Sequence, residues 1–117
     1  MVLEIKGKFR VNCELKRHLS PKTVGIITRS TPLKGNVHNL TNGIYFETHI
    51  ASGTERPKKE FKKGDIAFYS VGNCICFFYA DSKYNKPMTP IGKIITSIDE
   101  LTSSKIGDEI LFYEESG

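Results

Sequence analysis

The stretch from Gly64 to Phe78 reads GDIAFYSVGNCICFF, and it decides the fold of this 117-residue chain. Two short apolar runs, 66–69 and 74–78, are separated by Ser70 and a Val-Gly-Asn tripeptide that is typical of a tight turn. This pattern predicts two neighbouring antiparallel strands. The second run continues through Tyr79 and is apolar at every position, so the core must cover one face and a helix, a loop or a ligand the other. We expect it to be the most buried strand.

The first fifteen residues carry a strict period of two. From Leu3 to Leu15 the odd positions are apolar apart from Gly7, and the even positions are polar or charged. Such alternation is typical of strands with one buried face. Gly7 lies between two lysines in the middle of the pattern, where it favours a turn or bulge. The chain is therefore expected to open with an antiparallel hairpin.

Two short helices are expected. The first begins at Ser20-Pro21, because a Ser hydroxyl can cap a free N–H and Pro is tolerated at the first helical position. Val24 and Ile27 give this helix an inward stripe, and Pro32 ends it. The second begins at the Ser-x-x-Glu spacing of 97–100, which is typical of a capping box, and runs through Leu101.

The rest of the chain supplies further short strands. Residues 33–43 contain two Gly and three Asn and are expected to form a long loop, whereas 44–50, 91–95 and 109–113 are expected to be strands. About eight strands with two short helices suit a closed or nearly closed β-barrel, which also removes exposed strand edges. At this length one core has to serve the whole chain, so residues 1–117 are expected to form a single domain.

Composition excludes several classes of protein. With 38% hydrophobic and 26% charged residues the chain has the make-up of a folded domain. The longest apolar run, 75–80, is far short of the roughly 20 residues of a membrane span. Glu4 and Lys6 stand where a signal peptide needs an apolar stretch. The chain has three cysteines, an odd number that cannot pair completely in disulfides. We therefore expect a cytoplasmic protein with reduced thiols.

Three motifs, in this order, resemble the small uncharacterised cyclophilin-like family of bacteria and archaea. They are GDIAFY at 64–69, GNCICFF at 72–78 and PIGKI at 90–94. The opening hairpin, the helix with a Pro-containing cap and the strand at 44–46 are also similar, so the resemblance covers nearly the whole chain. It implies a cyclophilin-like β-barrel. It also permits a partner subunit, because related barrels occur within larger amide-hydrolysing or regulatory assemblies.

The same resemblance argues against catalysis of prolyl isomerisation. True cyclophilins carry an Arg that binds the substrate carbonyl, a Gln and a Phe on one strand, and a His. Phe78 matches the aromatic residue, but Cys76 stands in the place of the Gln and Met88 about in that of the His. Residues 34–46 offer no counterpart of the Arg, and lowering a barrier of about 18–20 kcal/mol needs such a donor. We expect no catalytic residues; a weak peptidyl-prolyl isomerase is the alternative.

A ligand groove is the expected functional feature. Neighbouring aromatic residues such as Tyr45 and Phe46 must lie on opposite faces of a strand, so one ring of each pair leaves the barrel interior. Rings outside the barrel pack under the helices or form a groove for a peptide or small molecule. The loop 34–42 is expected to form its wall. The candidate groove residues are Cys76, Phe78, Met88, His38, Asn39 and Tyr45.

The remaining chemistry-bearing residues have simpler interpretations. Cys74 and Cys76 share a face, but a zinc site needs four ligands and the other Cys and His are scattered, so both are expected to be small buried hydrophobes. A His beside a carboxylate can act as a general base, but neither His38 nor His49 accompanies a nucleophile motif. We expect no metal and no cofactor.

The charge balance raises one more alternative. The net charge is +4, and five Lys and Arg lie between Arg56 and Lys63, with another basic run at 16–18. These residues could contact phosphates, which makes a nucleic-acid binder the second alternative. A charged hairpin that protects a sheet edge explains the lysines as well, and no RNA-binding aromatic motif is present. We expect neither a nucleic-acid nor a membrane partner.

Overall fold

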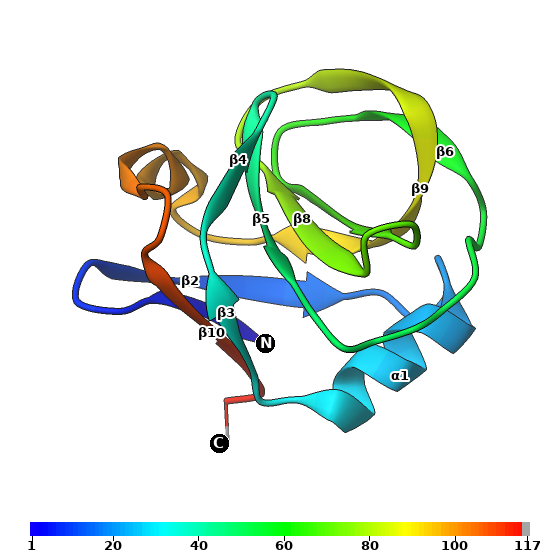
Figure 1. The fold of residues 1–117 in the computed structure, drawn as a ribbon, viewed down its shortest axis with the longest axis horizontal. Helices are drawn as coiled ribbons and strands as arrows, with labels where there is room; N and C mark the ends of the chain where they lie inside the picture. Colours follow the sequence, from blue (N-terminus) through cyan, green and yellow to red (C-terminus); the bar gives the residue numbers. More distant parts are fainter. Residues whose placement is uncertain (116–117) are drawn as a thin grey trace.

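The computed structural model describes residues 1–115, which form ten strands, one α-helix and one 3-10 helix (Figure 1). In chain order the elements are β1 Val2–Ile5, β2 Phe9–Leu15, α1 Pro21–Ser30, β3 Leu33–Asn36, β4 His38–Leu40, β5 Gly43–Glu47, β6 Lys58–Phe61, β7 Asp65–Tyr69, β8 Cys74–Phe78, β9 Ser82–Ile94, η1 Ile98–Ser103 and β10 Glu109–Tyr113.

All strand pairs are antiparallel and belong to one sheet, with the order β3-β10-β1-β2-β9-β7-β8-β5-β4 and with β6 paired to β9 off this path. The expectation of a mostly β fold is confirmed. The expected closed or nearly closed barrel of about eight strands is supported only in part, because the sheet of the described residues has ten strands and its order has two ends. Those ends, β3 and β4, are consecutive in the chain and are joined by the buried Val37.

The hairpins are where the alternation predicts them. β1 pairs with β2 in the register Val2↔Asn12, and Gly7 in the turn has a φ of 76°, a conformation that glycine adopts readily. β7 pairs with β8 and Tyr69 lies opposite Cys74. β10 occupies the predicted range and pairs with β1 on one side and β3 on the other.

The expected loop at 33–43 is wrong, because most of it is strand. β3 pairs with β10, β4 pairs with β5, and only Thr41 and Asn42 form a turn. The glycine that suggested a loop has a packing role. A Cβ on Gly35 would lie 2.7 Å from the Phe46 ring, so glycine lets this ring pack directly on the backbone of β3.

β9 is much longer than the expected strand at 91–95. It contains thirteen residues, of which the first part pairs with β6 and the second part pairs with β7 and β2. Its exposed lysines and two prolines conceal this strand in the sequence. β6 and residues 82–88 of β9, which we call the β6–β9 arm, arch over the outer face of β8 (Figure 1).

Both helix starts differ from the expected caps. Ser20 precedes α1, but its hydroxyl donates to the Pro90 carbonyl at 2.7 Å and makes no cap hydrogen bond. The cap comes from a distant residue: Glu55 accepts hydrogen bonds from Thr23 N at 2.5 Å and Thr23 Oγ1 at 2.6 Å. Ser97 has a φ of 54° and makes no side-chain cap either, and the element that follows is the 3-10 helix η1.

Removing the Glu55 carboxylate should therefore destabilise the protein in a pH-dependent way. Burial alone would raise the pKa of Glu55, but hydrogen bonds from Thr23 and Lys22 outweigh it and hold this pKa below its usual value. A lowered pKa stabilises the folded state above the unfolded pKa, and this contribution is lost as pH falls through the folded one. We expect Glu55→Ala to cost about 1 kcal/mol at pH 7 and progressively less below about pH 4.

Urea denaturation at pH 7 and pH 3 measures this difference. Glu60→Ala is the matched control, because Glu60 is exposed and pairs only with Lys83 at the surface. Equal costs for the two variants at pH 7, or a Glu55→Ala cost that persists unchanged at pH 3, would contradict the capping role.

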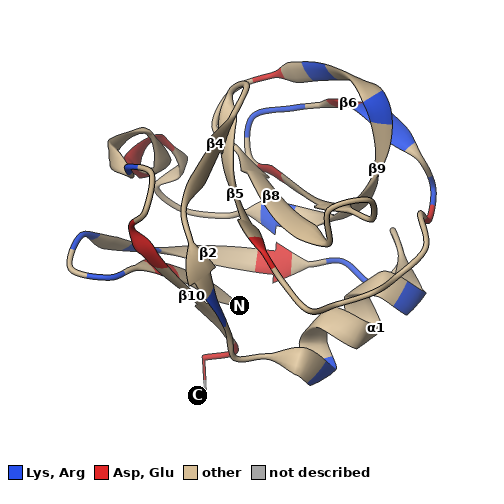
Figure 2. Ribbon diagram, in the orientation of Figure 1, with Lys and Arg blue, Asp and Glu red and all other residues tan. Residues whose placement is uncertain are grey.

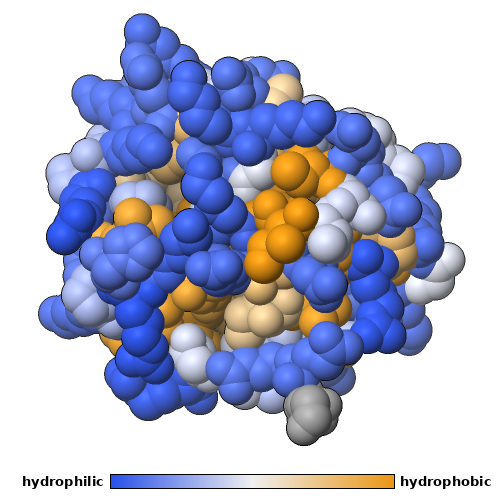
Figure 3. All heavy atoms as spheres, turned by 180° about the vertical axis from the view of Figure 1, so that it is seen from behind, coloured by the Kyte–Doolittle hydropathy of each residue, from blue (hydrophilic) through white to orange (hydrophobic). Residues whose placement is uncertain are grey.

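Two apolar clusters lie on the two faces of β8. Ile75 and Phe77 point into the main core with Phe46 and Phe112, while Cys74, Cys76 and Phe78 point into a second cluster under the β6–β9 arm. All five residues of β8 are buried, which confirms the prediction that both faces are covered. Seen from behind, hydrophilic residues cover most of the surface and apolar atoms show near its middle (Figure 3).

Within residues 1–115, neither helical segment has the length and apolar character that crossing a membrane would require.

Candidate functional site

A groove runs along the outer face of β8. Its floor is made by small side chains, Cys74 and Cys76, with Ala67 beside Cys76 on β7. The neighbouring positions on β5 and β7 carry large side chains, because Tyr45 lies opposite Cys76 and Tyr69 lies opposite Cys74. Small residues between large ones on adjacent strands leave a hollow of about 500 Å³. The residues that line it are Leu40, Tyr45, Glu47, Tyr69, Gly72, Cys74, Cys76 and Met88.

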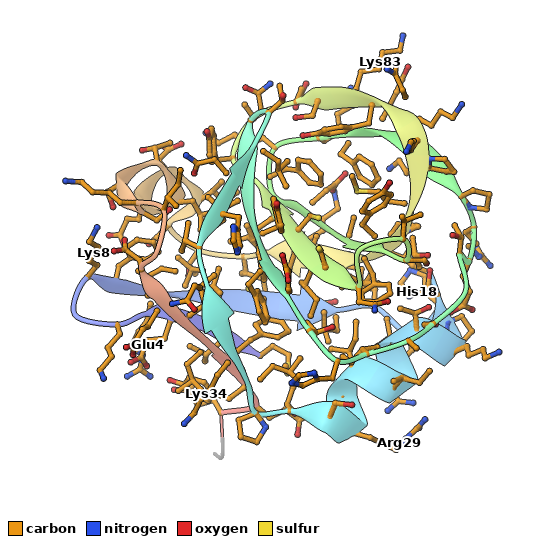
Figure 4. All side chains as sticks on the ribbon, viewed as in Figure 1. Glu4, Lys8, His18, Arg29, Lys34 and Lys83 are labelled. Atoms are coloured by element: carbon orange, nitrogen blue, oxygen red, sulfur yellow. The ribbon has the colours of Figure 1, made fainter. Side chains whose placement is uncertain are left out.

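The β6–β9 arm closes one end of this β8 groove. The Phe61 ring of the arm stacks on the Phe78 ring with centroids 4.8 Å apart and planes 5° apart, and the Tyr84 ring tilts against Phe78 at 5.7 Å. The Tyr84 hydroxyl donates to the carbonyl of Thr41 in the β4–β5 turn. Aromatic side chains fill the space between the arm and β8 (Figure 4). The arm is therefore fixed by packing at the Phe78 end, which leaves the Cys74 end open.

The electrostatics of the β8 groove favour binding over nucleophilic chemistry. Burial raises the pKa of the Cys76 thiol well above its usual value, and burial, with a smaller contribution from Glu47, also raises that of Cys74. Burial is the main cause of the raised pKa of Tyr45 as well. All three groups stay protonated at neutral pH, and a protonated thiol is a poor nucleophile. Glu47 is the one charged side chain among the described residues that line the groove.

The six candidate residues fall into three groups. Cys76, Met88 and Tyr45 line the β8 groove. Phe78 belongs to the same apolar cluster but is completely buried under the arm, and His38 lies beside the groove with its ring stacked on Tyr45 at 5.1 Å. Asn39 is exposed and lies on the opposite face of β4 from His38 and Leu40. The wall expected from a loop is strand β4, which contributes Leu40.

Sequence reasoning did not place Tyr69 or Glu47 in the groove, and it included Leu40 only as part of the expected wall 34–42. The alternation within each strand places Tyr69 and Glu47 outside the main core, and only the register between strands brings them to Cys74. Leu40 reaches the groove from strand β4, where a loop was expected. Knowing that β8 lies between β5 and β7, and in which register they pair, would have been enough to predict these residues, because residues i and i+2 of a strand share a face.

The other chemically reactive residues considered from the sequence do not come together in a site. His49 is exposed two residues after β5 and is not among the residues that line the groove. Among residues 1–115, no group of three or more His, Cys, Asp and Glu side chains is arranged to bind a metal ion. The described groove lining also contains no Arg, Gln or His, the residue types that cyclophilins use on their substrates.

The fold and the sequence were compared with those of known proteins. The solution structure of the hypothetical protein AF2241 from Archaeoglobus fulgidus is similar over 94% of this chain and 89% of that chain, with a TM-score of 0.79 and 24% sequence identity. No curated protein matches the chain in sequence. The family model described as cyclophilin-like matches residues 1–113, which is nearly the whole chain. The chain therefore belongs to the cyclophilin-like family.

Proposed function

We propose that this protein is a binding module that accommodates the apolar part of a peptide or small ligand in the β8 groove, without isomerising prolyl bonds. The observation that supports it best is the combination of a floor of small side chains with walls formed by Tyr45 and Tyr69. Ligand pockets commonly span roughly 300–1,000 Å³ and are lined by apolar and aromatic groups with a few polar ones. The groove, at about 500 Å³, fits that description.

The geometry also restricts the ligand. Tyr45 and Tyr69 lie on β5 and β7, on either side of β8, so their strands are about 10 Å apart. An aromatic ring or an extended aliphatic chain fits between two such walls. Glu47 lies at the open end next to Cys74 and forms no ion pair with any described residue. A ligand with an apolar body and a cationic end therefore suits the groove best.

Two matched probes test this preference. Phenethylamine and 3-phenylpropionate share an aromatic body and differ in the charge of the end group. In amide NMR titrations, we expect phenethylamine to shift signals of β5, β7 and β8, and 3-phenylpropionate to bind several-fold more weakly. Tyr69→Ala should lower the affinity for phenethylamine about tenfold, because a wall of the groove is lost. Tyr79→Ala is the control, since Tyr79 is also half-buried but packs on the main core.

Equal loss of affinity in the two Tyr variants, or signal shifts outside the groove strands, would argue that the β8 groove is not the site. The isomerase alternative is measured separately with a protease-coupled assay on a short Xaa-Pro peptide, where we expect no acceleration. An acceleration that Tyr69→Ala removes and Tyr79→Ala retains would replace the binding proposal by catalysis. Phe78→Ala does not serve here, because Phe78 is buried and its loss acts on the fold.

A further inference from the structure

A second hollow of about 410 Å³ lies apart from the β8 groove and shares none of its lining residues. It is formed where the start of β6, the start of β7 and the end of β9 meet the segment before α1. We call it the basic cleft, because its lining includes four cationic side chains, three from residues 56–62 and one from β9. The residues that line it are Leu19, Arg56, Pro57, Lys58, Lys62, Asp65, Ile66, Pro90, Gly92 and Lys93.

A single buried carboxylate, that of Asp65, pairs with two of these four cations, Lys58 and Lys93. Only 8% of the Asp65 side chain is exposed, and its two oxygens lie 3.2 Å from Lys93 Nζ and 3.8 Å from Lys58 Nζ. The second oxygen also accepts a hydrogen bond from the Lys62 backbone N–H at 2.8 Å. Asp65 and Lys93 are direct cross-strand neighbours, so the sheet register sets this pairing. The ammonium groups are thereby fixed at the rim of the cleft before any ligand arrives.

The cleft concentrates most of the excess charge of the protein. Four cationic side chains and one carboxylate line the cleft, whereas the whole chain has a net charge of only +4. Of the four, Lys62 also pairs with Asp81, which lies outside the cleft lining. Glu55, next to Arg56, is directed to Thr23 at the start of α1. Arg56 forms no ion pair with the described residues, so its guanidinium is free for a ligand. Figure 2 shows Lys and Arg along β6 and the segment before it.

Protection of a sheet edge accounts for only part of this arrangement. It explains outward-pointing lysines on β6 such as Lys59, which does not line the cleft. It does not explain why Lys93 of β9 and Arg56 of the preceding segment converge on the same hollow. Arg56 also has a φ of 42°, in the left-handed region that non-glycine residues rarely adopt.

We propose that the basic cleft binds the phosphate group of a small phosphorylated molecule. Arg56 presents a planar fork that can donate two parallel hydrogen bonds to phosphate oxygens, and Lys58 and Lys93 add point charges. The cleft has room beyond a phosphate, and Pro57, Pro90 and Leu19 offer apolar walls to an organic portion. The site is independent of the β8 groove, so either proposal can fail without the other.

Amide NMR titration of the intact protein tests the cleft with three probes: inorganic pyrophosphate, adenosine monophosphate and adenosine. We expect adenosine monophosphate to shift signals of residues 56–66 and 90–93, and adenosine to shift none. Arg56→Gln should lower this affinity about tenfold. Lys83→Gln is the matched control, because it also removes one positive charge from an exposed side chain, but Lys83 does not line the cleft and projects away from the arm (Figure 4). Arg56 is exposed and unpaired, so its variant retains the fold.

The three probes distinguish an inorganic from an organic source of the phosphate. Pyrophosphate binding as tight as adenosine monophosphate supports phosphate recognition with an inorganic source, and tighter nucleotide binding supports an organic one. Binding of adenosine alone, or equal losses in Arg56→Gln and Lys83→Gln, would overturn the proposal. So would binding of single-stranded oligonucleotide without any response to the three small probes, because the surface would then be a nucleic-acid site.

Discussion

Gly92→Ala is expected to prevent the protein from folding stably. A Cβ at this position would lie 2.1 Å from the Glu14 carbonyl oxygen and 3.0 Å from Leu15 Cα, and both are backbone atoms of β2. Gly92 stands where β9 pairs with β2 on one side and β7 on the other, opposite Leu15 and Ile66. Neither strand can move without breaking its ladder, so the cost should exceed about 3 kcal/mol, a large part of the stability of a small domain.

Circular dichroism during urea denaturation measures this effect. Gly53→Ala is the control, because no atom lies within 4 Å of its added Cβ and it has no positive φ. We expect it to change stability by less than about 0.5 kcal/mol. A Gly92→Ala protein whose midpoint lies close to that of Gly53→Ala would show that β2 can yield at this crossing, contrary to the packing described.

Phe78→Ala should detach the β6–β9 arm while leaving the rest of the sheet folded. The substitution removes the Phe61 stack and the Tyr84 contact, which fix the arm to β8. Truncation of a fully buried Phe costs about 3–5 kcal/mol. Because Phe78 lies in the second cluster and not in the main core, the loss falls first on residues 58–61 and 82–88. Their amides should exchange with solvent much faster than those of β1 and β10.

Phe77→Ala is the matched control, one residue away and equally buried. Its ring contacts Phe46 and Phe112 in the main core, so we expect its loss to lower protection throughout the sheet. Hydrogen exchange followed by mass spectrometry distinguishes the two patterns. If both variants lose protection uniformly, the two clusters unfold as one unit and the arm has no separate stability.

Local patterns predicted much of the architecture. The alternation at residues 3–15 gave the opening hairpin, and the unbroken apolar run at 74–78 gave a strand buried on both faces. Both signals are local, because side-chain direction in a strand follows directly from position. The helix at 21–30 was found for the same reason, since its Pro at the start and its inward Val24 and Ile27 are read from neighbouring residues.

What escaped prediction depends on partners far away in the chain. Residues 33–40 are strands because β10 and β5 pair with them, and the Gly and Asn residues there suggest a loop until those partners are known. The cap of α1 comes from Glu55, which no spacing rule around Ser20 could indicate. The residues of the groove were predicted only in part for the same reason. Tyr69 and Glu47 were missed, because only the strand register brings them next to Cys74.

The pairing of β3 with β10, a strand far along the chain, has a consequence for biosynthesis. β3 leaves the ribosome early, yet its one sheet neighbour among the described strands is β10, which also supplies the second neighbour of β1. At roughly 5–20 residues per second, about four to fifteen seconds separate the synthesis of residue 36 from that of residue 113. Throughout that interval the nascent chain exposes the unpaired edges of β1 and β3, which are open to pairing with other nascent chains.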